Sequence, residues 1–240
     1  MFKQIRKTMQ NTNGRCYFNM GEMLDSLALD HITNLSTMLI PFIADFKQAY
    51  LMLLTKSANI SNLLTVKANN QTVVSWSLNS PDIIDLHEKG TANLAERINS
   101  AQKCQQHGYR LHYRIDPGFI YPEWKKGYAE TIKMALTKTE PENITLGMLR
   151  LLPGHNRLAL NAYPSRPPVC DDNILKCKAS DGKLRFTTNL RIEFYKYLID
   201  IIRSFNKKVS IGICRETNQV LSELDGLIDL NKCNCITWQP

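Results

Sequence analysis

Charged side chains follow two apolar runs of this sequence, at the places where buried strands are expected to end. Gly21 and Glu22 come directly after the alternating run 17–20, and Lys56 ends the apolar run that begins at Tyr50. In α/β folds the carboxyl ends of parallel strands meet at one edge of the sheet, where ligands bind. A carboxylate and an ammonium group at that edge could act as acid and base partners. The alternative is a pair of ordinary solvated strand-end residues, which is common for such short motifs.

Further polar side chains belong to the same predicted edge. Ser75, Ser77 and Asn79 lie on one side of the β-rich run 71–79, because side chains alternate with period two in a strand. Asp116 stands near the end of the run 109–117. The sequence therefore predicts a group of small polar and acidic side chains near Glu22 and Lys56.

The seven cysteines of the chain have no regular spacing. An odd number of scattered cysteines in a long chain argues against a disulfide framework and favours reduced thiols. Cys214, Cys233 and Cys235 supply three thiols, but a Cys-x-Cys pair with one distant cysteine lacks a convincing tetrahedral spacing. Reduced, partly exposed thiols are the favoured interpretation, with a metal site as the alternative.

The elements that must position these residues form an alternating pattern of strands and helices. A basic amphipathic helix is expected within 1–14, a helix capped by Asp25 or Ser26 after the first strand, and a helix capped by Thr91. Two more helices are expected from Pro122 and over 190–204. Strands are expected at 17–20, 50–56, 71–79, 109–117, 144–150 and 209–214. This spacing is typical of parallel βαβ units and predicts the α/β class.

The composition changes between Leu152 and Thr188, where prolines and polar residues interrupt the pattern. We expect an irregular excursion with a hairpin at Asp181-Gly182, and we divide the chain into 1–151 and 152–240. Basic residues of the second half could place this excursion against a phosphate backbone, with Lys183 and Arg185 as its nucleic-acid contacts. The alternative is that these cations pair with Asp171, Asp172 and Asp181. The basic residues concerned are Arg110, Arg114, Lys125, Lys126, Arg150, Arg157, Arg166, Lys183 and Arg185.

The composition of the chain limits the classes of protein to which it can belong. The 240 residues are 43% hydrophobic and 22% charged, which is ordinary for a globular protein, and no apolar run is long enough for a membrane span. Because no secretion signal is evident at the start, we expect a cytoplasmic protein. The formal net charge of +8 favours polyanionic partners, of which DNA is the obvious one.

Seven short segments together resemble the spore photoproduct lyase family of radical SAM proteins. They follow in order along nearly the whole chain: Gly-Glu-x-x-Asp-Ser-Leu-Ala-Leu-Asp-His-Ile-Thr at 21–33, Leu-Leu-Thr-Lys-Ser at 53–57, Val-Ser-Trp-Ser-Leu-Asn at 74–79, Arg-Ile-Asp-Pro at 114–117, Ile-Thr-Leu-Gly-Met-Leu-Arg at 144–150, Asp-Gly-Lys-Leu-Arg-Phe at 181–186 and Ser-Ile-Gly-Ile-Cys-Arg-Glu-Thr at 210–217. No segment alone is specific, but the ordered set is.

The resemblance implies a partial (β/α) barrel that binds S-adenosylmethionine (SAM) beside a [4Fe-4S] cluster. It further implies radical chemistry that returns a thymine photoproduct in DNA to two thymines. The SAM-binding residues implied by position are Gly21, Glu22, Lys56, Ser75, Ser77 and Asp116. Lys56 suits the carboxylate of SAM, Glu22 its ammonium group, and hydroxyl or carboxylate groups its ribose.

The sequence departs from the family at two kinds of position. It contains no Cys-x-x-x-Cys-x-x-Cys spacing, which holds the family's cluster after the first barrel strand, and Glu22 stands where the namesake enzymes carry a hydrogen-donating cysteine. Asp116 likewise replaces a small residue. We therefore expect a truncated member that lacks the cluster segment and first strand and is inactive alone. A complementing N-terminal segment, or self-association through an open sheet edge, could complete it. The alternative functions are a nucleic-acid-binding remnant without catalysis and an unrelated barrel enzyme using Glu22 and Lys56.

Overall fold

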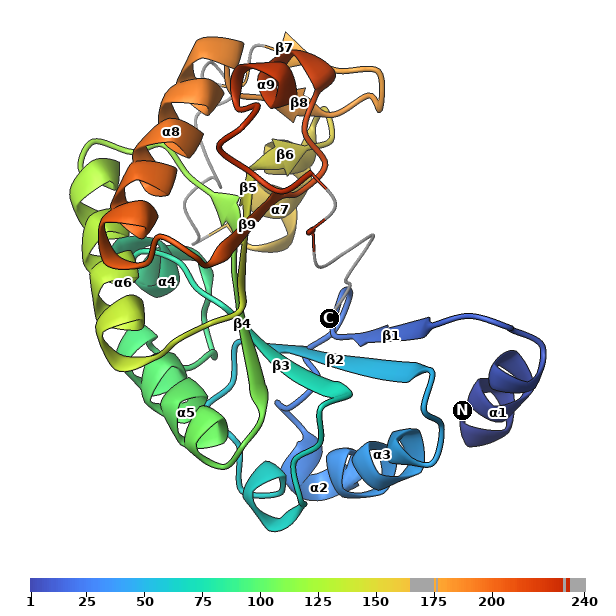
Figure 1. Cartoon of the computed structure of the whole chain (residues 1–240). Helices are drawn as coiled ribbons and strands as arrows, with labels where there is room; N and C mark the ends of the chain where they lie inside the picture. The colour runs from blue at the N-terminus through green and yellow to red at the C-terminus, as the bar shows by residue number, and fades with distance from the viewer. Residues whose placement is uncertain (165–174, 176, 231, 234–240) are drawn as a thin grey trace.

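A curved sheet of six parallel strands forms the centre of the protein (Figure 1). The structure, a computed structural model, describes residues 1–164, 175, 177–230 and 232–233. The sheet order is β1-β2-β3-β4-β5-β9, so that each new strand is added beside the preceding one. These strands span Cys16–Met20 (β1), Ala49–Thr55 (β2), Thr72–Ser77 (β3), Arg110–Gly118 (β4), Asn143–Met148 (β5) and Ser210–Ile213 (β9).

Helices cover the outer, convex side of this sheet, as Figure 1 shows for α5, α6 and α8. The apolar side chains that β3, β4 and β5 direct outward, such as Trp76, Tyr113 and Leu146, are buried there. The longer helices are α1 (Phe2–Gln10), α3 (Leu35–Ala44), α5 (Leu94–Gln106), α6 (Trp124–Lys138), α7 (His155–Ala162) and α8 (Thr188–Phe205). The shorter ones are α2 (Asp30–Thr33), the 3-10 helix η1 (Leu63–Thr65), α4 (Pro81–His87) and α9 (Asn218–Glu223).

The inner, concave side of the sheet carries polar side chains. Ser77 is paired in register with Arg114, and Arg114 with Thr145. One layer closer to the amino ends, Ser75 is paired with His112. Because side chains two residues apart share a face, Asp116 lies beyond Arg114 on the same side. The register thus brings side chains from neighbouring strands together at the carboxyl ends.

All six expected strands of the main sheet begin and end within about two residues of their predicted bounds. The α/β class and the partial parallel barrel are confirmed. Helices α2 and α3 follow the first strand as expected, but the predicted start at Asp25 or Ser26 is wrong, because 21–29 is a loop and regular helix begins at Asp30. Thr91 is not the cap of α5, since Asn93 and Glu96 form a capping box there.

The excursion contains one helix that the proline-rich composition did not predict, α7, and the expected hairpin. Strands β7 (Cys177–Lys178) and β8 (Leu184–Arg185) pair across the Asp181-Gly182 turn, and β6 (Arg150–Leu151) adds to β8. β9 then pairs with β5 in the main sheet. The boundary after Leu151 stays a prediction, and the main sheet includes strands from both sides of it.

Several sequence hypotheses concern residues outside the described part of the chain: Arg166, Asp171, Asp172 and Cys235. Among the described strands, β1 stands at one end of the sheet order, which is the edge where pairing with another chain was predicted. Within the described residues, no helix is long and apolar enough to cross a membrane.

Candidate functional site

A cavity of about 340 Å³ opens at the carboxyl ends of β1 to β4. Its walls come from the loop after β1, the end of β2 with Lys56, the end of β3 and the end of β4. The lining residues are Gly21, Glu22, Met23, Leu24, Asp25, Leu54, Thr55, Lys56, Ser77, Arg114 and Asp116. Five of the six residues predicted to bind SAM therefore line one cavity.

Gly21 lets the loop after β1 pass close to β2. Its φ is +92°, and a Cβ at this position would lie 2.3 Å from the carbonyl oxygen of Leu54. No other residue type combines this left-handed conformation with so close a contact. The glycine thus determines the shape of one wall of the cavity.

Asp25 fixes the same loop to the end of β2. Its Oδ1 accepts hydrogen bonds from the amide of Leu27 at 2.8 Å and the hydroxyl of Thr55 at 2.7 Å. Its Oδ2 accepts from the amide of Lys56 at 2.6 Å. Oδ1 also accepts from the amide of Ala28 at 2.9 Å, so Asp25 makes the local contacts predicted for a cap, but it stabilises a loop rather than the start of a helix.

Arg114 connects the carboxylates on two sides of the cavity. Its Nη1 donates to Glu22 Oε2 at 3.1 Å, and its Nη2 donates to Asp116 Oδ2 at 2.8 Å. Arg150 also donates to Asp116, with 3.2 Å between Nη2 and Oδ2. Burial disfavours the charged form of Asp116, but the Arg150 and Arg114 guanidinium groups hold the pKa of its carboxyl below the usual range. Asp116 is therefore an ionised structural partner of two arginines as well as a cavity residue.

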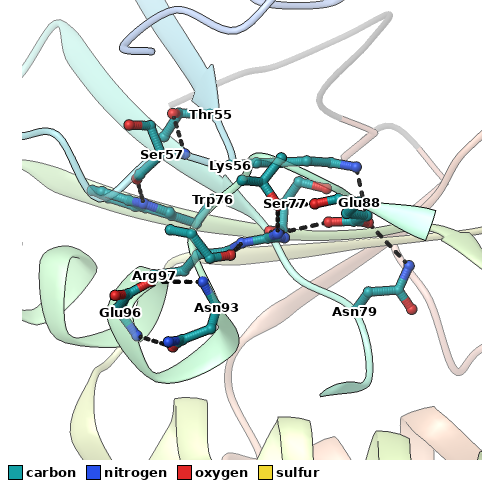
Figure 2. A network of polar contacts seen from close by, with 12 residues as sticks. Thr55, Lys56, Ser57, Trp76, Ser77, Asn79, Glu88, Asn93, Glu96 and Arg97 are labelled. Carbon is teal, nitrogen blue, oxygen red and sulfur yellow. Dashed lines mark hydrogen bonds and ion pairs between the residues drawn. The ribbon is translucent and has the colours of Figure 1, made fainter. Parts of the chain in front are cut away.

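Lys56 belongs to a second ionic network, drawn in Figure 2. Its Nζ lies 2.9 Å from Glu88 Oε1, and Arg97 Nη2 lies 2.7 Å from Glu88 Oε2. Burial again opposes ionisation, but Lys56 and Arg97 lower the pKa of the Glu88 carboxyl. Arg97 is fully buried, whereas the Lys56 side chain is about one third exposed at the cavity.

Three cavity groups keep hydrogen-bonding capacity toward a ligand. Both contacts of Glu22, from Asn19 and Arg114, reach Oε2, so Oε1 accepts no hydrogen bond from the described residues. An ammonium group has three donors, and Lys56 uses one of them, toward Glu88. The Ser77 hydroxyl makes no hydrogen bond within the described part of the chain. A carboxylate oxygen, an ammonium group and a hydroxyl thus face one cavity.

The sixth predicted residue, Ser75, does not line the cavity. It is fully buried in β3, one layer below Ser77. Sequence reasoning missed Arg114 and Asp25 as cavity residues and did not consider Glu88 and Arg97. Arg114 could have been found, because period two places it on the same face of β4 as Asp116.

Arg185, predicted to contact nucleic acid, donates to both carboxylate oxygens of Asp181 at 2.7 Å, and its side chain is only 5% exposed. This ion pair is the alternative that the sequence left open for Arg185. Lys183 lies in the same turn, where its amide donates to Asp181 Oδ1.

Of the three cysteines considered as metal ligands, Cys214 and Cys233 lie in the described part of the chain. Cys214 is buried at the end of β9, with its Sγ 3.6 Å from Arg114 Nη2. Cys233 is also buried, and a Cβ on Gly212 of β9 would lie 2.8 Å from its amide nitrogen. The described residues contain no group of three His, Cys, Asp or Glu side chains arranged to hold a metal ion.

The fold and the cavity define an α/β protein with a parallel half-barrel and a ligand pocket at the carboxyl ends of its strands. Residues 1–196 match the family model "Spore photoproduct lyase". The chain therefore belongs to the spore photoproduct lyase family, which confirms the resemblance seen in its motifs.

Curated relatives and solved structures agree with this assignment. The chain is 30% identical over 162 residues to a spore photoproduct lyase of Clostridium acetobutylicum, covering 65% of this chain and 48% of that protein. It is 29% identical over 129 residues to that of Bacillus subtilis, covering 52% and 38%. The chain thus matches about half or less of these relatives' length.

A solved spore photoproduct lyase with bound AdoMet and dinucleoside spore photoproduct superposes with a TM-score of 0.79 at 22% identity. The match covers 88% of this chain and 64% of that one. This likeness supports the half-barrel fold.

Proposed function

We propose that this chain is the SAM-binding half-barrel of a spore photoproduct lyase-type protein, whose complete form repairs thymine photoproducts in DNA by radical chemistry. The observation that carries the proposal is the arrangement of Glu22, Lys56 and Ser77 around one cavity, each with hydrogen-bonding capacity left. Family membership and the solved relative that holds AdoMet support the same ligand.

The groups in the cavity fit SAM by charge and by hydrogen bonding. Glu22 Oε1 would accept from the ligand's ammonium group, and the two remaining donors of Lys56 would bind its carboxylate. Ser77 would hydrogen-bond a ribose hydroxyl. Asp116 is assigned a different part, because Arg114 and Arg150 already form ion pairs with it: it holds Arg114, which in turn orients Glu22. Ser75 lies one layer below Ser77 and would support the cavity wall without contacting SAM.

The residues of this chain do not fit a [4Fe-4S] cluster. Such a cluster needs several cysteine thiolates at matched positions, and the 240 residues contain no Cys-x-x-x-Cys-x-x-Cys spacing. The part we assign to this chain is therefore to bind and orient SAM and to exclude water from it. Photoproduct repair would require thiolates from outside the 240 residues.

The second candidate is a nucleic-acid-binding protein without SAM chemistry. The net charge of +8 and the half-exposed Lys183 at the hairpin turn favour it. The Arg185–Asp181 ion pair weakens it, because that guanidinium is already neutralised and buried. DNA remains our proposed substrate for the complete protein, with relatives of this family solved with a dinucleoside photoproduct.

Equilibrium dialysis of labelled SAM against the 240-residue chain, in parallel with fluorescence titration of duplex DNA, separates the candidates. The proposal expects saturable SAM binding that excess 5′-methylthioadenosine, which lacks the amino-acid part, displaces poorly. DNA binding without SAM binding would favour the second candidate. Reductive formation of 5′-deoxyadenosine by the chain after anaerobic iron and sulfide treatment would contradict the assignment of a binding part alone.

A further inference from the structure

Glu88 and Arg97 contact two residues that line the cavity, Lys56 and Ser77 (Figure 2). Neither residue lines the cavity. Glu88 follows α4 and Arg97 lies on α5, and both side chains are almost completely buried. This buried ion pair contacts Lys56, the lysine that we assign to the carboxylate of SAM.

Arg97 joins the ends of β2 and β3. Its Nη1 donates to the carbonyl of Ser77 at 2.9 Å, and its Nε donates to the carbonyl of Ala92 at 2.8 Å. The amide of Ala92 in turn donates to the carbonyl of Lys56 at 3.2 Å. One guanidinium group therefore fixes the backbone of the two residues that we assign to the ligand's carboxylate and ribose.

Glu88 adds a contact to the side chain of Lys56. Its carboxylate bridges Arg97 and the Lys56 ammonium group, with Oε2 on the first and Oε1 on the second. Asn79 Nδ2 lies 3.5 Å from the same Oε1. The Lys56 side chain is long and partly exposed, so without this carboxylate it would sample many rotamers.

We propose that Glu88, held by Arg97, is a positioning residue that presets the Lys56 ammonium group for the carboxylate of SAM. This inference rests on the proposed function, because it concerns the same cavity. A positioning role and a charge-compensating role of Glu88 predict opposite effects on the affinity for SAM. A carboxylate that only balanced the charge of Lys56 would weaken binding of an anionic ligand group, whereas a positioning carboxylate strengthens it by reducing the ordering that binding requires.

Two substitutions of Glu88 separate these roles. Glu88→Asp keeps the charge but shortens the side chain by one methylene, so that it no longer reaches both cations. Glu88→Gln keeps the length but removes the charge. Arg97 retains its contacts with Ser77, Thr91 and Ala92 in both variants, and a thermal melt monitored by circular dichroism checks that each variant is folded.

If Glu88 positions Lys56, both variants weaken SAM binding by roughly three- to tenfold. Neither variant weakens it further in a Lys56→Met background, because the effect acts through that side chain. The matched control is Glu142→Gln, which breaks another glutamate–arginine pair at the amino end of the sheet and should leave SAM affinity within about twofold.

Tighter binding by Glu88→Gln, with no change in Glu88→Asp, would show charge compensation and overturn the proposal. Equal effects of both variants with and without Lys56 would assign Glu88 a general structural part and also overturn it. A wild-type chain that binds SAM while all Glu88 variants bind equally well refutes only this inference. A wild-type chain that does not bind SAM refutes the proposed function together with it.

Discussion

Arg114 and Glu22 are joined across the mouth of the cavity, with 3.1 Å between Nη1 and Oε2. Glu22 follows β1 and Arg114 lies on β4, so two intervening strands separate their backbones in the sheet. The same guanidinium binds Asp116. Positions 22 and 116, at which we expected the sequence to depart from its family, are thus members of one ionic network.

Replacement of Arg114 tests the structural part of this network. Arg114→Gln leaves the nearly buried Asp116 with Arg150 as its remaining cationic partner, and we expect a loss of roughly 2 kcal/mol in the free energy of unfolding, measured with urea. Lys125→Gln is the control, because its ion pair with Glu193 is half exposed and should contribute about 0.5 kcal/mol or less. An Arg114 variant as stable as the control would show that the network contributes little.

Acid unfolding should depend on Glu142. Burial opposes its ionisation, but His112 and Arg110 lower the pKa of its carboxyl from 4.5 to about 2. A depressed pKa means that its stabilising contribution is complete above about pH 4.5 and is lost as the pH falls toward about 2. Because the side chain is 44% exposed, we expect this contribution to be only about 1 kcal/mol.

Urea unfolding of the wild type and Glu142→Gln, at about pH 6 and about pH 3, measures this contribution. The variant should be less stable than the wild type at the higher pH, and the difference should shrink at the lower one. A difference that does not change with pH would mean that the pKa of Glu142 is not depressed by folding.

Gly21→Ala should destabilise the protein. The new methyl group would lie 2.3 Å from the Leu54 carbonyl oxygen in a backbone with φ of +92°. Gly226→Ala is the matched control, since Gly226 has a φ of +73° and no atom within 4 Å of an added Cβ. We expect Gly21→Ala to lower the midpoint of thermal unfolding more than Gly226→Ala, by the equivalent of roughly 2 kcal/mol. Equal midpoints would mean that the contact with Leu54 relaxes freely.

The sequence predicted the main sheet well, because its strands are short apolar runs separated by helical spacing. Parallel strands buried on both faces are readily detected from such runs. Asp25 accepts from the amides of Leu27 and Ala28, as a helix cap would. It also binds Thr55 and Lys56 at the end of β2, which holds 21–29 as a loop, so that regular helix begins only at Asp30. The Asn93–Glu96 capping box could have been found, since Asn-x-x-Glu is a local signal.

The candidate site was predicted in part. The rule that ligands bind at the carboxyl ends of parallel strands located Gly21, Glu22, Lys56, Ser77 and Asp116 in one cavity. The rule could not show that Arg114 and Arg150 form ion pairs with Asp116, or that Glu88 forms one with Lys56. Those contacts join distant segments and depend on how α4 and α5 pack against the sheet.

The hairpin of β7 and β8 provides the test of DNA binding. If Lys183 and Arg185 bind phosphates, changing both to Ala should reduce the slope of log affinity against log salt by about 0.9 for each phosphate that is no longer neutralised. The Asp181 ion pair leads us to expect most of the change from Lys183→Ala, and lower stability from Arg185→Ala. Equal affinities and slopes for the wild type and double variant, in salt titrations with a fluorescent duplex, would remove the hairpin from DNA binding.

Calorimetric titration of SAM into the wild type, Glu22→Gln, Lys56→Met and Lys133→Met tests the proposed site most directly. Lys133 is an exposed lysine of α6 away from the cavity and serves as the control. Because hydrogen bonds to charged groups contribute roughly 1.5 to 3 kcal/mol, we expect about tenfold weaker binding or more for each cavity variant and unchanged binding for Lys133→Met. SAM binding of equal strength in all four proteins would contradict the account, since it would locate the ligand away from Glu22 and Lys56.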